Sequence, residues 1–176
     1  QTYTVQLPGR REQRYRWLPA LMITVPLIVV AATRDGNIGD TAAYLVGFHD
    51  TPSSFSDIPE MLTGPGKDKG FRVFNVLLKV LIGDNRYLYL GVVAAISLIS
   101  VAYVYRKYSC NFAMSMFLFI ASSDYIQWTH NGMRQFIAVA VIFAATDLLL
   151  QKKYLLDHCN VCIYLLLFCL IVRYFL

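Results

Sequence analysis

A run of 19 residues without any charge, from Tyr87 to Tyr105, is the feature that most constrains this chain. At 1.5 Å per helical residue it extends about 28 Å, close to the thickness of a bilayer's hydrocarbon core. Tyrosines stand at both ends of the run, as in the aromatic belts of membrane-spanning helices, and Arg106 and Lys107 follow it. The sequence therefore predicts a helix that crosses a membrane.

Other apolar segments repeat this design. They cover residues 17–33, 109–127, 133–150 and 155–172. The chain is 57% hydrophobic and 15% charged, whereas soluble domains have about 25% charged residues and arrange their apolar side chains in stripes rather than blocks. We expect an all-α, polytopic helical membrane protein, a single membrane domain over residues 1–176 with about five transmembrane helices.

The segment 71–83 is too short for a span and carries charge. On a helix, Arg72, Asn75, Lys79 and Arg86 would share one face, with apolar side chains around the rest. This pattern predicts a short amphipathic helix. Two placements stay open: the helix lies in the membrane interface, or it re-enters the membrane with its polar face toward a protein cavity.

Clusters of Lys and Arg set the orientation. The basic segment 1–16, Arg106 with Lys107, and Lys152 with Lys153 are all expected on the cytoplasmic side. This assignment is consistent only if segment 71–83 does not cross, and it places the loop 34–70 outside. The same clusters account for the net charge of +5 without a basic face for nucleic acid.

The cysteines do not indicate a metal site. Cys159 and Cys162 form a C-x-x-C pair, but no second pair completes the four ligands that zinc normally takes. We therefore expect no metal and no cofactor.

Arg134 is the most informative charge, because it stands in the first turn of the helix predicted over 133–150. The start of a helix has a partial positive charge that disfavours a cation unless an anion lies between the guanidinium and the free backbone N–H groups. This position predicts an anion site. Two other interpretations stay open: Arg134 extends toward the interface as an anchor, or it pairs with Asp124.

Further polar residues are expected on the same outer side of the membrane: Arg34, Asp40, Arg72 and Gln135. Several cations on one face indicate a polyanionic or pyrophosphate ligand. His130 is a candidate proton-transfer group because its ordinary pKa is near neutrality, although a lone interfacial histidine beside Trp128 is more often an anchor.

Three blocks of sequence resemble the EpsG-type, Wzy-like family of polysaccharide polymerases. They are "TRDGNIGDTAAYLVGF", "DKGFRVFNVLLKVL" and "NGMRQFIAVAVIFAATDLLLQKKY". The first is similar to the family's Arg, Gly-x-Asp and Tyr pattern, the second to its acidic-x-Gly-aromatic start, and the third to its Arg-Gln-x-x-Ala helix. Matched by position, Arg34, Asp40 and Tyr44 fall in the first motif, and Arg134 and Gln135 in the last.

The resemblance implies a multi-pass enzyme of the bacterial cytoplasmic membrane that joins oligosaccharide units carried on polyprenyl pyrophosphate at the outer face. Such enzymes build capsule, exopolysaccharide or O-antigen, with membrane lipid and other polysaccharide-assembly membrane proteins as partners. The expected residues are, as catalytic groups, Arg134, Arg34 and Asp40, and as substrate-binding groups, Gln135, Tyr44, Arg72 and His130.

The resemblance leaves alternatives open. Family members are usually longer, so the chain is expected to be a fragment, a truncated form or a form with a divergent tail. A transporter for anionic lipid-linked substrates and a non-catalytic membrane subunit also fit an outer cationic site. A transporter needs polar groups that continue to the other face, and between Arg134 and Asp147 the sequence offers none.

Overall fold

The computed structural model describes residues 2–7, 10–63 and 68–150. Within these ranges the chain is helical apart from one antiparallel hairpin of strands β1 (Thr2–Leu7) and β2 (Arg10–Tyr15). The hairpin occupies the basic segment 1–16, for which the sequence predicted no strand. The predicted span 155–172 lies outside the described residues.

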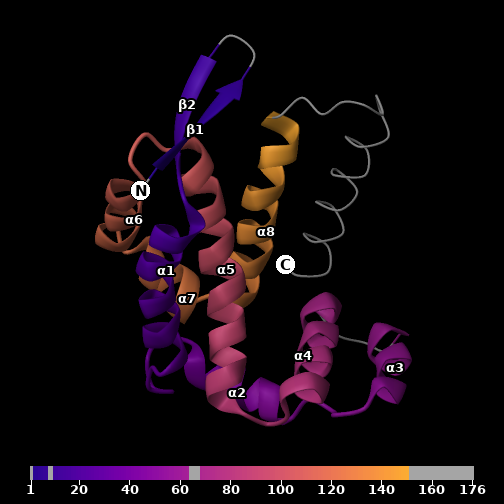
Figure 1. The fold of residues 1–176 in the computed structure, drawn as a ribbon. Coiled ribbons are helices and arrows are strands. Elements are labelled where there is room, and N and C mark those ends of the chain that lie inside the picture. The colour runs from indigo at the N-terminus through magenta and orange to yellow at the C-terminus, as the bar shows by residue number, and fades with distance from the viewer. Residues whose placement is uncertain (1, 8–9, 64–67, 151–176) are drawn as a thin grey trace.

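Three helices form the centre of the molecule (Figure 1): α1 (Trp17–Ala32), α5 (Arg86–Tyr108) and α8 (Met133–Leu150). α1 runs antiparallel to α5. The ring of Trp17, at the start of α1, stacks on Tyr103 near the end of α5. At the other end, Ala32 lies against Gly91. The small residues let the two helices approach closely.

α8 runs parallel to α5. Its first residue, Met133, packs with Tyr89 at the start of α5, and Asp147 pairs with Lys107 at the other end. These relative directions place the start of α1 and the end of α5 at the same end of the bundle, while the orientation in a membrane stays a prediction. We call the two ends of this bundle the Arg134 end and the Asp147 end.

The amphipathic segment forms α4 (Lys69–Ile82). Near its start, Asp68 contacts Arg134, and near its end the Nζ atom of Lys79 donates to the carbonyl oxygen of Phe48 at 3.2 Å. Both ends of α4 therefore lie at the Arg134 end, and the helix does not run along the whole bundle (Figure 1).

The loop predicted over residues 34–70 contains short helices. These are α2 (Thr41–His49), the 3-10 helix η1 (Phe55–Asp57) and α3 (Ile58–Thr63). α2 follows the turns of the "DGNIGD" stretch, where Asp35 accepts a hydrogen bond from the backbone N–H of Asn37 at 3.1 Å. Sequence reasoning missed these helices because each is shorter than a clear periodic pattern.

The predicted continuous span 109–127 is wrong, because the structure divides it into α6 (Phe112–Ala121) and α7 (Asp124–His130). The break falls at Ser122 and Ser123, and Ser123 has a left-handed φ of 69°. The Ser122 hydroxyl lies 2.6 Å from the carboxylate of Asp124. Short polar side chains bond locally and so interrupt a helix that its apolar residues alone would continue.

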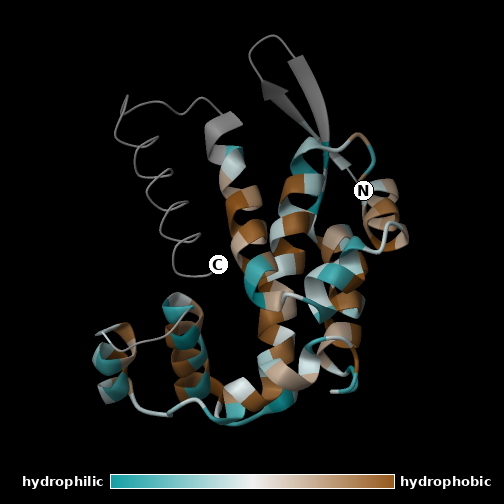
Figure 2. Cartoon of the chain, turned by 180° about the vertical axis from the view of Figure 1, so that it is seen from behind, coloured by the Kyte–Doolittle hydropathy of each residue, from teal (hydrophilic) through white to brown (hydrophobic). Residues whose placement is uncertain are grey.

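Among the described helices, α5 alone is long and apolar enough to cross a membrane, and α1 and α6 are shorter apolar helices. Five spans therefore stay a prediction. α1 and α6 nevertheless expose large apolar side chains, among them Leu18, Met22 and Phe117. Figure 2 shows hydrophobic colouring along much of the bundle, interrupted by polar patches, and polar colouring on one side of α4.

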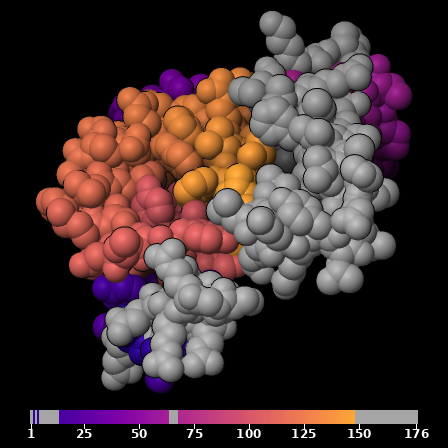
Figure 3. All heavy atoms as spheres, turned by 90° about the horizontal axis from the view of Figure 1, so that it is seen from above, coloured from indigo at the N-terminus to yellow at the C-terminus, as the bar shows by residue number. Residues whose placement is uncertain are grey.

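The core has two parts. One cluster centres on Leu98, Val101, Phe112 and Met116 and joins α5 to α6. In Figure 3, viewed from the Asp147 end, α6, α7 and α8 form one continuous surface. The second cluster lies at the Arg134 end, listed as Phe48, Phe71, Leu78, Tyr89, Leu90, Val93, Met133 and Ile137. It is the apolar base on which the candidate site rests.

Candidate functional site

A cavity of about 350 Å³ lies at the Arg134 end, between α2, α3, the start of α4 and the first turn of α8. Its polar lining consists of Tyr44, Asp50, Thr51, Asp68, Arg72, Asn75 and Arg134. Arg72 and Arg134 bring two positive charges, and Asp50 and Asp68 bring two negative ones. Among the described residues of the lining, positive and negative charges are therefore equal in number.

The central contact of the cavity is an ion pair between Arg134 and Asp68, in which Nη1 donates to Oδ2. The anion expected beside Arg134 is thus supplied by the chain itself, and it is Asp68 rather than Asp124. Both side chains are largely buried, with 29% and 19% of their surface exposed. Arg134 Nε and Asp68 Oδ1 are buried without a hydrogen-bond partner, so neither group uses its full bonding capacity.

The backbone of Asp68 is strained toward this contact. Its φ is 63°, in the left-handed region that costs a residue with a side chain about 1 kcal/mol or more. Asp68 immediately precedes α4, where an aspartate usually accepts from the first backbone N–H groups of the helix. Its carboxylate makes no such bond and is directed to Arg134 instead.

Aromatic and amide groups complete the lining. The rings of Tyr44 and Phe71 meet edge to face with centroids 5.8 Å apart. Burial raises the pKa of the Tyr44 hydroxyl, while the neighbouring backbone and charge of Arg134 act in the opposite direction. Tyr44 is therefore a neutral phenol at pH 7. Asn75 is buried, and its Oδ1 atom has no hydrogen-bond partner.

Arg34 does not line this cavity. It holds together the helix ends next to it. Its side chain is 5% exposed. Its guanidinium donates to three acceptors: Thr41 Oγ1 at 2.8 Å, the Ala31 carbonyl oxygen at 2.8 Å and Met133 Sδ at 2.7 Å. Burial lowers the pKa of Arg34 to about 10, which still leaves it charged at neutral pH.

Asp40 approaches the turn before α8. Its Oδ2 atom accepts from the backbone N–H of Gly132 at 3.3 Å, and its own N–H donates to the carbonyl oxygen of His130 at 3.3 Å. Gly39 makes this docking possible, because its φ is 57° and an added Cβ would lie 2.2 Å from Asn131 Oδ1. Asp40 therefore positions the start of α8 and does not line the cavity.

His130 and Gln135 also lie outside the lining. His130 is buried, its Nδ1 atom lies 2.7 Å from the hydroxyl of Thr129, and its ring packs edge-on against Tyr125. Burial and the charge of Arg34 lower its pKa, so the imidazole is neutral at pH 7. Gln135 is exposed.

Of the seven residues predicted from sequence, the cavity thus brings together Tyr44, Arg72 and Arg134. Sequence reasoning missed Asp68, Asn75 and Asp50. Asp68 stands in the quoted block "DKGF", but nothing local connects it with Arg134, which is 66 positions away. The sequence did offer one signal for Asp68: it is an aspartate at the expected start of a helix, followed closely by Gly70 and Phe71.

A family model described as the EpsG family matches residues 17–174. The chain belongs to the EpsG family. Membership makes it a membrane protein of polysaccharide biosynthesis, as the resemblance of its three blocks implied. No curated protein and no solved structure matches the chain.

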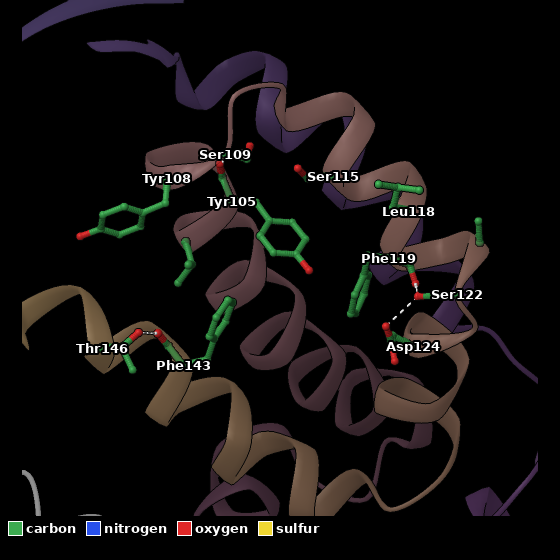
Figure 4. A pocket seen from close by; sticks show the side chains of 12 residues that line it. Tyr105, Tyr108, Ser109, Ser115, Leu118, Phe119, Ser122, Asp124, Phe143 and Thr146 are labelled. Atoms are coloured by element: carbon green, nitrogen blue, oxygen red, sulfur yellow. Dashed lines mark hydrogen bonds between the residues drawn. The ribbon is translucent and has the colours of Figure 1, made fainter. Parts of the chain in front are cut away.

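A larger cavity of about 810 Å³ lies elsewhere in this EpsG-family chain, between α5, α6 and α8 (Figure 4). The rings of Tyr105, Phe119 and Phe143 gather along it, with edge-to-face contacts from Tyr105 to both phenylalanines. Among the described residues of its lining, Asp124 is the one that carries a charge. The described lining offers no cation for an anionic ligand, so we assign the candidate site to the smaller cavity.

The other buried ion pair of note lies at the Asp147 end. Lys107 pairs with Asp147, and their side chains are 8% and 2% exposed. The hydroxyls of Tyr103 and Tyr108 also donate to this carboxylate. The cluster joins the ends of α5 and α8, and we interpret its role as stabilising the packing of these two helices.

Proposed function

We propose that this EpsG-family chain is a membrane glycosyltransferase that joins oligosaccharide repeat units carried on polyprenyl pyrophosphate. The single observation that carries the proposal is the cavity at the Arg134 end, where Arg134 and Arg72 both line a space with Tyr44. Arginine suits this role because its planar guanidinium matches phosphate oxygens in two-point contacts.

The charge that develops during glycosyl transfer explains why arginines are needed. A sugar hydroxyl of one unit attacks the anomeric carbon of the other, and the bond to the lipid pyrophosphate breaks. Negative charge then develops on the leaving pyrophosphate, where fixed cations lower the barrier. Arg134 and Arg72 supply these cations, and the rings of Tyr44 and Phe71 offer apolar surface for a sugar ring.

Orientation supports a reaction at the outer face of the bacterial cytoplasmic membrane. The cavity lies at the Arg134 end of the bundle, whereas Arg106 and Lys107 lie at the opposite end of α5. By the positive-inside rule, the end rich in Lys and Arg faces the cytoplasm. Arg34, Asp40 and His130 then hold the loop and helix start that frame the cavity.

The proposal is tested by replacing the chromosomal gene of the host bacterium with Arg134→Ala and Arg134→Lys variants. We expect both to abolish long-chain glycan at unchanged protein level in the membrane, because an ammonium cannot reproduce the guanidinium fork. Glycan length is measured on gels and protein level by immunoblot. Glu60→Gln is the control, because Glu60 is exposed at the same end but does not line the cavity.

Normal chain length in Arg134→Ala would overturn the proposal. The same strains separate transfer from transport. A transfer defect leaves single repeat units exposed at the outer face, where a periplasmic or extracellular glycosidase can reach them. A transport defect leaves these units inside and protected.

A further inference from the structure

The Arg134–Asp68 pair combines features that structural support does not require. The contact uses one nitrogen of Arg134 and one oxygen of Asp68, while Arg134 Nε and Asp68 Oδ1 are buried without hydrogen bonds. An Arg–carboxylate pair that serves only stability favours the two-point geometry, which satisfies both groups. This one leaves a buried donor and a buried acceptor unsatisfied, and a ligand can reach them only when the two side chains separate.

The carboxylate is also held away from its ordinary position. Asp68 has the left-handed φ of 63° and makes no bond to the N–H groups of α4, although it stands where a capping aspartate normally bonds. Strain of this kind persists where the surrounding structure enforces it, and it concentrates at functional sites. Here it directs the carboxylate into the cavity.

The contact between Arg134 and Asp68 indicates what happens when a ligand enters. Among the described residues of the lining, Asp68 occupies the guanidinium of Arg134 in the free protein. A pyrophosphate bound to Arg134 competes with Asp68 for the same guanidinium. It also adds negative charge beside the Asp68 carboxylate, and the repulsion favours separation of that carboxylate from Arg134.

We propose that Asp68 is the general base of the transfer reaction, held by Arg134 in the free protein and released when pyrophosphate takes its place. The inference rests on the proposed function. In the step, the acceptor oxygen forms a bond to the anomeric carbon and its proton passes to Asp68. The bond from that carbon to the pyrophosphate oxygen breaks, and the electron pair leaves with the pyrophosphate, stabilised by Arg134.

A split between binding and turnover tests this role. In Asp68→Asn, the guanidinium of Arg134 loses its competing carboxylate, so the purified full chain in detergent micelles should bind inorganic pyrophosphate several-fold tighter than wild type, by calorimetry. Glycan lengthening in cells should fall about 100-fold or more, the usual contribution of a general base. Glu60→Gln, which removes an exposed acid from α3, should change neither quantity.

Asp68→Glu guards against simple misfolding, because it keeps a carboxylate that can reach Arg134. We expect it to bind pyrophosphate near the wild-type level and to recover part of the chain lengthening that Asp68→Asn loses. If Asp68→Asn binds pyrophosphate as weakly as Arg134→Ala, or lengthens glycan normally, the inference is overturned and Asp68 is only a partner of Arg134.

Failure of the proposed function itself has a different signature. In that case wild-type protein binds no pyrophosphate, and Arg134→Ala still makes long-chain glycan. That result would overturn the inference about Asp68 as well as the proposed function. By contrast, suppose that pyrophosphate binding depends on Arg134 while Asp68→Asn is fully active. The proposed function then stands, and the role of Asp68 as general base is overturned.

Discussion

The guanidinium of Arg34 donates a hydrogen bond to the sulfur of Met133, the residue directly before Arg134. Through this contact and its bonds to Ala31 and Thr41, one buried side chain connects the end of α1, the start of α2 and the start of α8. Arg34 therefore determines where Arg134 stands, without lining the cavity.

We expect Arg34→Met to lower the free energy of unfolding by several kcal/mol, because each buried acceptor left without a donor costs about 1 to 3 kcal/mol. Thermal unfolding in detergent micelles measures the change, with exposed Arg16→Met as control. Glycan lengthening should decline in parallel with the amount of folded protein. An Arg34→Met variant that melts like wild type would contradict a positioning role.

Gly39→Ala tests the docking of the first outer loop on α8. The left-handed φ alone costs an alanine roughly 1 to 2 kcal/mol, and the added Cβ would also collide with Asn131 Oδ1 and the carbonyl oxygen of His130. Gly83→Ala separates the two effects, because Gly83 has a φ of 67° but no atom within 4 Å of an added Cβ. We expect Gly39→Ala to lower the melting temperature more than Gly83→Ala, and equal shifts would rule out the collision.

The pair of Lys107 and Asp147 predicts a large effect of removing one charge. Asp147→Asn leaves the ammonium of Lys107 buried without its carboxylate, a change that typically costs about 3 to 5 kcal/mol. Asp84→Asn is the control, because its pair with His49 is exposed and should contribute about 1 kcal/mol or less. Chemical denaturation of the two variants compares them directly.

His130 predicts a dependence of stability on pH. Burial and the nearby charge of Arg34 lower its pKa in the folded protein, so the unfolded chain binds the proton more readily. The stability that neutral His130 provides is complete above the unfolded pKa of about 6.5 and declines as pH falls below it.

Melting temperatures measured between pH 5 and pH 8 check this sign. We expect the decline at acidic pH to be smaller in His130→Gln, which keeps a hydrogen-bonding side chain but cannot titrate there. If the variant and the wild type decline equally, other groups cause the acid sensitivity.

The apolar blocks of the sequence located the central helices closely. The predicted apolar segments 17–33, 87–105 and 133–150 form α1, α5 and α8 almost to their ends, because apolar runs of this length have few alternatives to a helix. The break between α6 and α7 was not foreseen. It depends on local hydrogen bonds of Ser122, and these act against the apolar character of the whole segment.

The sequence by itself determined the class of the chain, its family, and the placing of Arg134 at the start of a helix that needs an anion. The tertiary structure alone decided which anion that is. Asp68 is separated from Arg134 by 66 positions along the chain, and no local sequence pattern can indicate a contact between residues so far apart. The packing of α4 near α8 brings the two side chains together, and the same packing places Tyr44 and Arg72 beside them while it directs Arg34 and His130 into the protein interior.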